Sequence, residues 1–368
     1  MKILFSDNSL WGLLNFRGGI IRHFVSKGYE VILVAPLDNE GMQMKIPERV
    51  KYIPICVNRS GRNPISDIKY FYDVVNIYKR ERPDYIFHYT IKPNIYGTIA
   101  ARILKIRSSA MIAGLGYAFA EKTLSAFIAR AMYKYSLRYA EYVFVLNENN
   151  YKVLIDGRIT SDSKVIWLKG GEGVDLNKFC FNDTRNNVSM PRFLMVSRLL
   201  YDKGYSEFVA AANKLKSYAK FVVMGAIDSR PSAVPLDVIK YDVAHNNIEY
   251  IAFSPNVISQ MEQADCIVLP SYYSEGLSRV LMEACAIGRP IICSDIPGCK
   301  ETVENGVNGF ICHAKDSQSL IECCEKFIAL SQKERREMGQ AGRLRAEDIF
   351  DERIVIDEYD KILSNNIG

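Results

Sequence analysis

Two glutamates spaced eight residues apart, Glu275 and Glu283, lie at the start of a predicted helix in the second half of the chain. Because an α-helix rises about 1.5 Å per residue, eight residues span roughly 12 Å, close to the length from the ribose to the sugar of a nucleotide-sugar. A carboxylate accepts hydrogen bonds from two hydroxyls and so suits a vicinal diol. We expect Glu283 to hold the ribose hydroxyls and Glu275 to hold hydroxyls of the sugar.

The loop before this helix suits a phosphate group. A predicted strand ends at Leu269, and a loop containing Pro, Ser and Gly follows it. The free N–H groups of a helix N-terminus, with the positive end of the helix dipole, attract anions. We expect Gly276, Leu277 and Ser278 to bind a diphosphate there without a metal ion. Two glutamates at this spacing are common on surface helices, so the prediction depends on the whole strand–loop–helix pattern.

A second loop, Ser197–Gly204, supplies two cations. It follows a predicted strand, and a helix is predicted to come after it. Arg198 can form a fork of hydrogen bonds to phosphate oxygens, and Lys203 can act as a point charge. Most Arg and Lys side chains in loops are simply solvated. At a strand end in the same half of the chain as the two glutamates, we expect this pair to neutralise the charge of a departing diphosphate.

The pattern of strands indicates which elements position these loops. Short apolar runs alternate with helical patterns in both halves, which predicts parallel sheets covered by helices on both faces. The predicted strands are 2–5, 30–35, 52–57, 85–88, 109–113 and 142–146 in the first half, and 192–196, 221–225, 249–251, 266–269, 290–293 and 309–312 in the second. A turn is expected at Gly18-Gly19, followed by a helix toward Ser26.

The fold class predicted is α/β, with two doubly wound, Rossmann-like domains that face a cleft. A polar stretch leading to Pro191 is the best linker, so the expected domains are residues 1–185 and 190–345. Residues 346–368 form a terminal helix that could pack back on the first domain. Ligands of such domains bind at the carboxyl ends of the strands.

These motifs together resemble a known family. Ser-Arg-x-x-x-x-Lys-Gly at 197–204, followed by Pro-Ser-x-x-x-Glu-Gly and then Glu-Ala in 270–284, is similar to the signature of the large retaining GT-B glycosyltransferase family. Segments 171–179, 295–301 and 305–309 also match family segments. The resemblance covers nearly the whole chain and is most specific from Arg192 to Cys312. It implies a UDP-sugar donor bound by the second domain.

Within the family, the chain resembles the branch that extends polyprenyl-diphosphate-linked sugars with N-acetylhexosamines such as N-acetylgalactosamine. Segments 15–17, 88–94 and 114–117 carry this closer likeness. Two features depart from the family pattern: Ser278 stands where Pro is common, and Gly18-Gly19 is a short form of the family's Gly-rich loop. Both departures leave the acceptor's identity open, and the sugar and the linkage also stay open.

The resemblance implies roles for further residues of the first domain. Gly18 and Gly19 would approach the donor phosphates, although a simple turn is an equal alternative. His88 and Lys92 would contact the donor sugar or the acceptor diphosphate, and a structural role for His88 is the alternative. The acceptor-binding set implied is Arg17, Lys92, Tyr117 and Glu172, with a hinge role as the alternative for Glu172. Asn147 and Glu148 are weaker candidates.

The reaction implied is sugar transfer with retention of anomeric configuration. We find no confident nucleophile, so a front-face route is the hypothesis, with His88 and Glu275 beside the two cations at the reacting centre. Neither a metal nor a cofactor is expected, since the four histidines show no zinc spacing. Two alternatives stay open: a UDP-sugar epimerase on the same fold, and a scaffold subunit without activity. A dehydrogenase is excluded because no Gly-x-Gly-x-x-Gly follows the first strand.

Composition indicates where the protein works. A net charge of +5 is too small and too dispersed for nucleic-acid binding, but suits phosphate-bearing substrates and anionic lipid. Nine scattered cysteines indicate reduced thiols and the cytoplasm. No signal peptide or membrane span is found. Residues 124–139 mix apolar and basic side chains, which fits a core helix with a basic face or a helix on a bilayer. We expect a peripheral position on the inner face of the plasma membrane, near a lipid-linked acceptor.

Overall fold

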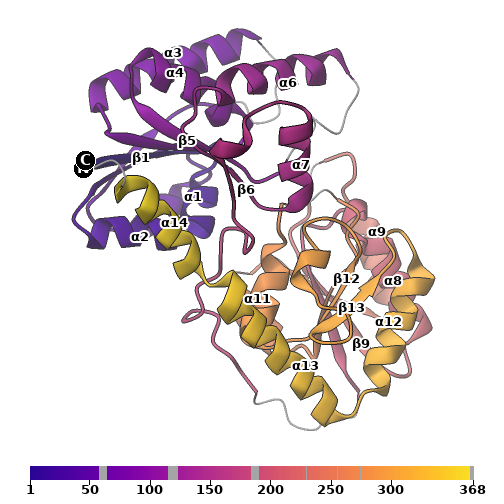
Figure 1. Cartoon of the computed structure of the whole chain (residues 1–368). Coiled ribbons are helices and arrows are strands. Elements are labelled where there is room, and N and C mark those ends of the chain that lie inside the picture. Colours follow the sequence, from indigo (N-terminus) through magenta and orange to yellow (C-terminus); the bar gives the residue numbers. More distant parts are fainter. Residues whose placement is uncertain are drawn as a thin grey trace. The chain divides into compact units, whose positions relative to one another are not determined.

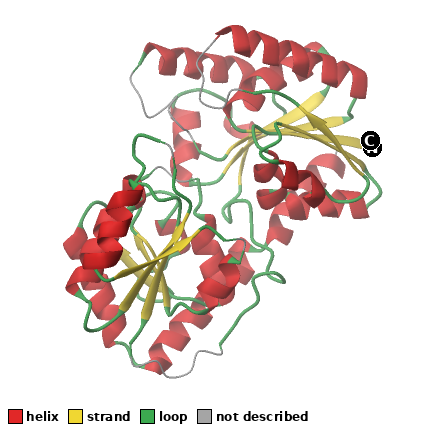
Figure 2. Ribbon diagram, turned by 180° about the vertical axis from the view of Figure 1, so that it is seen from behind, coloured by secondary structure: helices red, strands yellow, loops and turns green. Residues whose placement is uncertain are grey.

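The computed structural model describes residues 1–57, 64–114, 123–183, 190–228, 230–254, 256–273 and 276–364. They form two compact units. Unit 1 combines Met1–Glu172 with the C-terminal stretch from Glu352, and unit 2 is Gly173–Asp351. In each unit a parallel sheet lies between layers of helices (Figure 2).

The sheet of unit 1 has seven parallel strands in the order β3-β2-β1-β4-β5-β6-β7. The inner strands are buried on both faces, as their continuous apolar runs require. The strands are β1 (Lys2–Ser6), β2 (Glu30–Ala35), β3 (Val50–Pro54), β4 (Tyr85–Tyr89), β5 (Arg107–Ile112), β6 (Val143–Val145) and β7 (Val165–Trp167). The main helices are α1 (Leu10–Phe16), α2 (Gly18–Ser26), α3 (Pro64–Glu81), α4 (Thr98–Ile103), α6 (Leu124–Leu137), α7 (Glu148–Asp156) and α14 (Glu352–Ser364).

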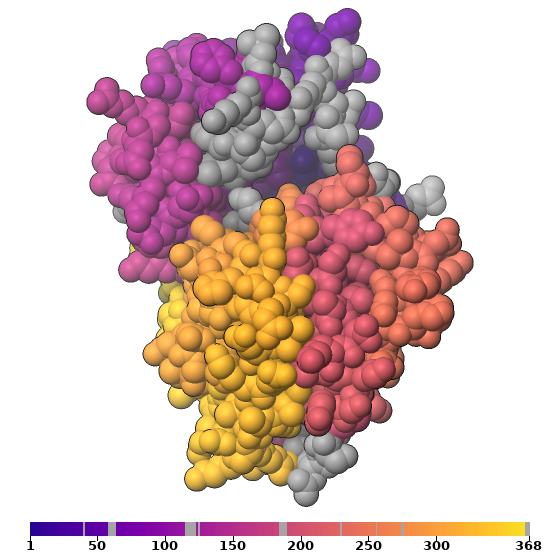
Figure 3. Space-filling model, turned by 90° about the vertical axis from the view of Figure 1, so that its right-hand side faces the viewer, coloured from indigo at the N-terminus to yellow at the C-terminus, as the bar shows by residue number. Residues whose placement is uncertain are grey.

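Unit 2 repeats this plan with six strands in the order β10-β9-β8-β11-β12-β13. Its strands are β8 (Arg192–Val196), β9 (Lys220–Gly225), β10 (Ile248–Ala252), β11 (Cys266–Leu269), β12 (Ile291–Ser294) and β13 (Gly309–Cys312). Its helices are α8 (Tyr205–Lys214), α9 (Leu236–His245), α10 (Val257–Glu262), α11 (Arg279–Ile287), α12 (Ser317–Ala329) and α13 (Gln332–Arg345). α8 and α12 pack against each other, and their segments lie side by side on the face shown in Figure 3.

The strand order places a switch point in each unit. The chain winds one way from β1 to β2 and β3, then the other way from β4 onward, and unit 2 reverses in the same manner between β8 and β11. Ligands of doubly wound sheets bind at the carboxyl ends of the strands beside such a reversal. The loops that follow β1, β4, β8 and β11 therefore lie where a ligand is expected to bind.

The strands predicted from the sequence are all present, with ends that differ by a few residues at most. The sequence missed β7, whose three residues are too few to show a period. The turn predicted at Gly18-Gly19 is wrong, because both glycines begin α2. Arg17, with φ of −116° and ψ of 6°, makes the junction between α1 and α2 instead. At Gly19 the Glu352 carboxylate lies where a β-carbon would be, so a larger residue there would have to displace that flexible side chain.

The chain passes between the units at Glu172–Gly173 and returns at Asp351–Glu352, whereas the sequence placed the boundaries at 185–190 and 345–346. Residues just beyond the first crossing contact unit 2: Val174 pairs with Asp351 in a β-bridge, and the Asn182 N–H donates to the Ile287 carbonyl. The terminal helix α14 belongs to unit 1 (Figure 1), the arrangement considered from the sequence. The hydroxyl of Tyr359 in α14 is hydrogen-bonded to the hydroxyl of Tyr89 in β4 at 2.9 Å.

Candidate active site

The loop after β8 holds Arg198 at the carboxyl edge of the unit 2 sheet. The next two residues, Leu199 and Leu200, are fully buried and anchor the loop, and the Leu199 N–H donates to the carbonyl of Ala226 at 3.0 Å. The Arg198 side chain remains about a third exposed, and its Nη1 lies 3.1 Å from Oδ2 of Asp228. The guanidinium is therefore fixed by a buried anchor on one side and by a carboxylate on the other.

The two loops predicted to hold a diphosphate lie against each other. Gly204 has φ of +85°, and a β-carbon there would lie 2.6 Å from the Pro270 carbonyl carbon. The carbonyl of Asp202 accepts hydrogen bonds from the Tyr272 N–H at 2.9 Å and from Ser271 Oγ at 3.3 Å. The loop after β8 is thus joined to the loop after β11, at the reversal of strand order.

Lys203 lies within this junction. Its side chain is mostly buried, and its Nζ lies 4.7 Å from the centroid of the Tyr273 ring. A cation over an aromatic face is stabilised by the ring quadrupole. The ammonium group of Lys203 therefore lies beside the loop that follows β11.

The helix that follows, α11, starts at Arg279, two residues after Leu277, near which the sequence pattern predicts its start. Ser278 is its N-cap, but the Ser278 side chain makes no capping hydrogen bond, and the Ser278 N–H donates to the Gly298 carbonyl at 2.7 Å. Gly276 is half-buried, and Leu277 is buried. Glu275, predicted to hold the sugar, lies outside the described residues.

Glu283, one turn along α11, is held by an arginine that the sequence analysis did not select. Arg279 Nε lies 3.0 Å from Glu283 Oε1, and both side chains are largely buried. Burial raises the pKa of Glu283, while Arg279 and Lys178 act in the opposite direction. The i,i+4 spacing of Arg279 and Glu283 was visible in the sequence and could have identified the pair.

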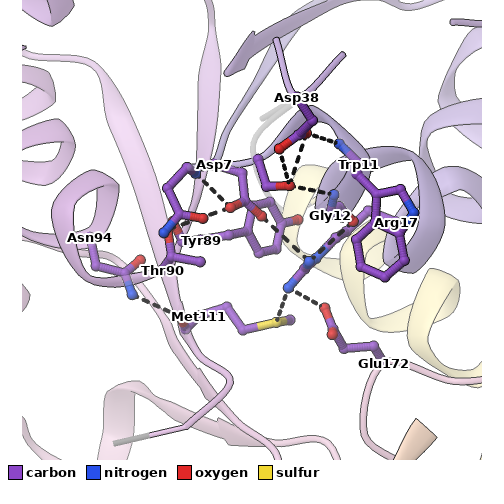
Figure 4. A network of polar contacts seen from close by, with 12 residues as sticks. Asp7, Trp11, Gly12, Arg17, Asp38, Tyr89, Thr90, Asn94, Met111 and Glu172 are labelled. Atoms are coloured by element: carbon purple, nitrogen blue, oxygen red, sulfur yellow. Dashed lines mark hydrogen bonds and ion pairs between the residues drawn. The ribbon is translucent and has the colours of Figure 1, made fainter. Parts of the chain in front are cut away.

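A buried charge cluster occupies the carboxyl edge of the unit 1 sheet (Figure 4). Arg17 lies between two carboxylates, with Nη1 3.4 Å from Asp7 Oδ2 and Nη2 2.5 Å from Glu172 Oε1. Its guanidinium also stacks 4.3 Å from the centroid of the Tyr89 ring. Two of the predicted acceptor-binding residues, Arg17 and Glu172, are thus brought together, although here they bind each other.

Asp7 is the member of this cluster that the sequence analysis missed. It follows β1 directly and is buried, and burial raises its pKa to about 6 against the opposing effect of Arg17. Thr90, which follows β4, donates from Oγ1 to Asp7 at 3.4 Å and has φ of +67°, an unusual value for a β-branched residue. Backbone strain of this kind is concentrated at functional sites. The position of Asp7 directly after the first strand was the signal that could have found it.

His88 lies apart from this cluster, inside the sheet of unit 1. Its side chain is fully buried, with Nε2 3.0 Å from the Tyr78 hydroxyl and Nδ1 3.3 Å from Thr98 Oγ1. Burial lowers its pKa to about 3. A contact between His88 and a substrate would require the ring to leave these partners, so the geometry favours the structural alternative.

The remaining predicted residues are found as follows. Lys92 pairs with Asp67 at 2.5 Å and is partly buried. Gly18 and Gly19 form the first turn of α2. Tyr117 lies outside the described residues. Asn147 caps α7 through the Asn150 N–H, so the local helix accounts for it.

Two further observations concern metal binding and a cavity in unit 2. Among the described residues, no group of three or more His, Cys, Asp or Glu side chains could hold a metal ion. Unit 2 has a cavity of about 280 Å³, but Asp265 and Pro290, which line it, precede β11 and β12. The cavity is therefore at the edge of the sheet opposite to Arg198 and is not part of this site.

Two doubly wound units in one chain, with paired loops and fixed cations at a switch point, define the GT-B class of α/β proteins. Comparison with known families agrees. Residues 178–345 match the family described as "Glycosyl transferases group 1", and residues 2–147 match "Glycosyl transferase 4-like". The chain belongs to the glycosyltransferases.

Similar proteins fall in the same class. The N,N'-diacetylbacillosaminyl-diphospho-undecaprenol alpha-1,3-N-acetylgalactosaminyltransferase of Campylobacter jejuni is 27% identical over 99% of this chain and 100% of its own. An alpha-1,3-galactosyltransferase of Escherichia coli that acts on alpha-D-GlcNAc-diphosphoundecaprenol is 24% identical over 74% of this chain and 73% of its own. The crystal structure of Anabaena HepE with UDP-glucose superimposes with a TM-score of 0.82 at 17% identity, covering 99% of this chain and all of that one.

Proposed function

We propose that this enzyme moves an N-acetylhexosamine, such as GalNAc or GlcNAc, from a UDP-sugar to a polyprenyl-diphosphate-linked saccharide in bacterial surface glycan assembly. The observation that carries the proposal is the junction of two loops in unit 2. Through Gly204 and Asp202, the loop with Arg198 and Lys203 is locked to the loop that leads into α11. Two relatives, the Campylobacter jejuni and Escherichia coli transferases, are named for undecaprenyl-diphosphate-linked acceptors, which supports the lipid-linked class.

The charge distribution at this junction suits a departing nucleoside diphosphate. When the bond between the sugar C1 and the diphosphate oxygen breaks, negative charge grows on that oxygen. Arg198 and Lys203 are cationic side chains, and the N-terminal end of α11 adds the positive end of the helix dipole. Groups that are oriented in advance stabilise this charge without reorganisation, so we propose that no metal ion is required.

Retention follows if the acceptor attacks from the face that the diphosphate leaves. In this front-face route the acceptor hydroxyl oxygen forms a bond to C1 as the C1–oxygen bond to UDP breaks. The proton of the hydroxyl passes to the departing phosphate oxygen, so UDP leaves and no protein nucleophile is consumed. Glu283 would hold the ribose and thereby fix the donor's position.

Asp228 forms ion pairs with two arginines of unit 2, one of which is Arg198. Arg198 is 3.1 Å and Arg230 Nε is 3.6 Å from the same Asp228 oxygen. An arginine that must meet a diphosphate is kept in one orientation by such a carboxylate. We propose that Asp228 holds Arg198 ready before the donor arrives.

On the acceptor side, the buried cluster of Asp7, Arg17 and Glu172 borders the carboxyl edge of β1 and β4. Both terminal nitrogens of Arg17 are paired with these carboxylates, so we propose that it shapes the acceptor site rather than binding phosphate directly. Lys92 is held by Asp67 and is partly exposed, which leaves it the better phosphate ligand of the two.

The surface of α6 fits a membrane that presents such an acceptor. Its inner face, with Ala129, Tyr133 and Leu137, packs into the core of unit 1. Phe127 and Ile128 are 63% and 50% exposed on the outer face, where Lys134 is also exposed. Exposed Phe and Ile beside a lysine fit an interfacial helix, which inserts its apolar side chains between lipids beside anionic headgroups. No described helix has the length and apolar character to cross a bilayer.

A donor panel tests the proposal. Purified enzyme is incubated with single UDP-sugars, in EDTA and in Mg²⁺, with and without a synthetic polyprenyl-diphosphate sugar, and products are identified by mass spectrometry and NMR. We expect one N-acetylhexosamine to be added in an α linkage, equally in EDTA. Product formed from the UDP-sugar alone would indicate an epimerase, and transfer with inversion or only with Mg²⁺ would contradict the mechanism.

A further inference from the structure

Arg279 joins two features that the sequence analysis treated separately. Its Nε lies 3.0 Å from Oε1 of Glu283, and its Nη1 donates to the carbonyl of Gly173 at 3.2 Å. Gly173 is the first residue of unit 2 after the chain leaves unit 1. One guanidinium therefore contacts both the carboxylate expected to bind ribose and the peptide at the crossing.

The other side of this crossing is held by Arg17. Glu172, the last residue of unit 1 before the crossing, forms the 2.5 Å ion pair with Arg17. The glycines on either side, Gly171 and Gly173, have φ of +62° and +72°, values that glycine alone adopts readily. A continuous chain of contacts and one peptide bond thus leads from Glu283 to the buried cluster in unit 1.

The returning chain is attached to the same point. The Val174 N–H donates to the Phe350 carbonyl at 2.6 Å, and Val174 pairs with Asp351, after which the chain re-enters unit 1. A shift of Gly173 would therefore affect both connections between the units.

We propose that Arg279 is a positioning residue that couples occupation of the nucleotide site to the acceptor-side cluster through the Glu172–Gly173 peptide. Ribose hydroxyls donating to Glu283 compete with Arg279 for its carboxylate, which changes how Arg279 holds Gly173. A ligand shifts an arrangement only through contacts that differ between its states, and the shared carboxylate supplies that difference. The inference rests on the proposed function, because it takes Glu283 as the ribose ligand.

Unit 2 offers a matched control for Arg279. Arg343 also pairs through Nε with the glutamate four residues on, Glu347, at 2.7 Å, and its Nη1 donates to the Phe179 carbonyl at 3.2 Å. The Nη1 of Arg343 also donates to the Ala286 carbonyl of α11 at 2.9 Å, but none of these three contacts involves Glu283 or the crossing. Arg279→Lys and Arg343→Lys keep the charge and lose the fork of two donors, since one ammonium cannot reproduce it.

Hydrogen exchange with UDP alone separates the possible results. At saturating UDP without acceptor, we expect exchange at the Val174 amide to change by a factor of about five or more in the wild type and in Arg343→Lys, the lower end of couplings between sites. In Arg279→Lys, UDP should bind but leave this amide unchanged. If UDP binds and Arg279→Lys responds like the wild type, or if the wild type does not respond, the coupling is refuted and the proposed function stands. If UDP does not bind the wild type, the proposed function itself fails.

A double-mutant cycle gives an independent readout. Arg279→Lys and Glu172→Gln act at opposite ends of the Glu172–Gly173 peptide, and without coupling through that peptide their fold-losses in kcat/KM multiply. With coupling, we expect the fold-loss in kcat/KM caused by Glu172→Gln to be at least about threefold smaller in the Arg279→Lys background than in the wild type. Arg343→Lys with Glu172→Gln should multiply, and multiplication in both pairs would overturn the inference.

Discussion

Replacing Gly204 by alanine tests whether the junction of the two loops organises the site. Gly204 has φ of +85°, and an added β-carbon would lie 2.6 Å from both the carbonyl carbon and Cγ of Pro270. Neither atom is at the free end of a flexible side chain. The loop with Arg198 and Lys203 must therefore move away from the loop that begins α11.

The loss of stability caused by Gly204→Ala can be estimated by comparison with Gly306→Ala. That residue has φ of +82°, but a β-carbon there would have nothing within 4 Å. Left-handed backbone costs an L-residue about 1–2 kcal/mol, which Gly306→Ala alone would show. Gly204→Ala adds a steric cost of about 1–3 kcal/mol. Since 1 kcal/mol shifts Tm by about 2–4 °C for a domain of this size, Gly204→Ala should melt about 2–12 °C below Gly306→Ala.

Both variants are measured by thermal unfolding of the full chain and by kcat/KM with donor and acceptor. We expect Gly204→Ala to lose at least about tenfold in kcat/KM, roughly 1.4 kcal/mol of transition-state stabilisation, while Gly306→Ala retains activity near the wild type. Equal melting temperatures, or full activity in Gly204→Ala, would refute the view that contact between the loops positions the cations.

Three further predictions concern charge, burial and the membrane. Arg198→Ala should lose about 10²–10³-fold in kcat, whereas Arg230→Ala, which removes the more distant cation on Asp228, should lose far less; similar losses would contradict the assignment. Because burial lowers the pKa of His88 to about 3 from an ordinary 6.5, the unfolded chain takes up a proton that the folded ring excludes, so this stability is complete above pH 6.5 and is lost as the pH falls toward 3. Urea titrations from pH 7.5 to 5 should therefore show a steeper loss for the wild type than for His88→Asn, and parallel slopes would refute the burial argument. Phe127→Ser with Ile128→Ser should abolish sedimentation with phosphatidylglycerol vesicles without changing UDP affinity, while Tyr218→Ser, an equally exposed aromatic in unit 2, should have no effect; retained sedimentation would refute the α6 surface.

Periodicity was sufficient to predict the fold, and strand-end position was sufficient to place the loops after β8 and β11. The alternation of apolar runs gave both sheets, because buried parallel strands leave long apolar signals. The sequence did not predict β7 because this strand has only three residues, all of them half-buried. The turn predicted at Gly18-Gly19 was wrong because glycine can also begin a helix, and here the Glu352 side chain occupies the space beside Gly19. The domain boundary differs because the β-bridge of Val174 to Asp351, which keeps residues after 172 in unit 2, joins distant parts of the chain.

Among the site residues, those placed by a strand end were predictable from the sequence, and those defined by tertiary contacts were not. Arg198 and Lys203 follow β8 at a position that the sequence revealed. Their partners Asp228 and Tyr273 could not be predicted, because these contacts depend on how separate loops fold together. Arg17 and His88 were selected by residue type and likeness, yet the type of a residue does not indicate whether its charge is already paired or its ring enclosed.

The central claim is that Arg198, Lys203 and the first turn of α11 together take up the negative charge of a departing nucleoside diphosphate. A crystal structure of the UDP complex grown in EDTA tests it most directly. The account predicts pyrophosphate oxygens within hydrogen-bonding distance of both side chains and of the N–H groups at the start of α11. Pyrophosphate bound elsewhere, or visible only when Mg²⁺ is supplied, would contradict it.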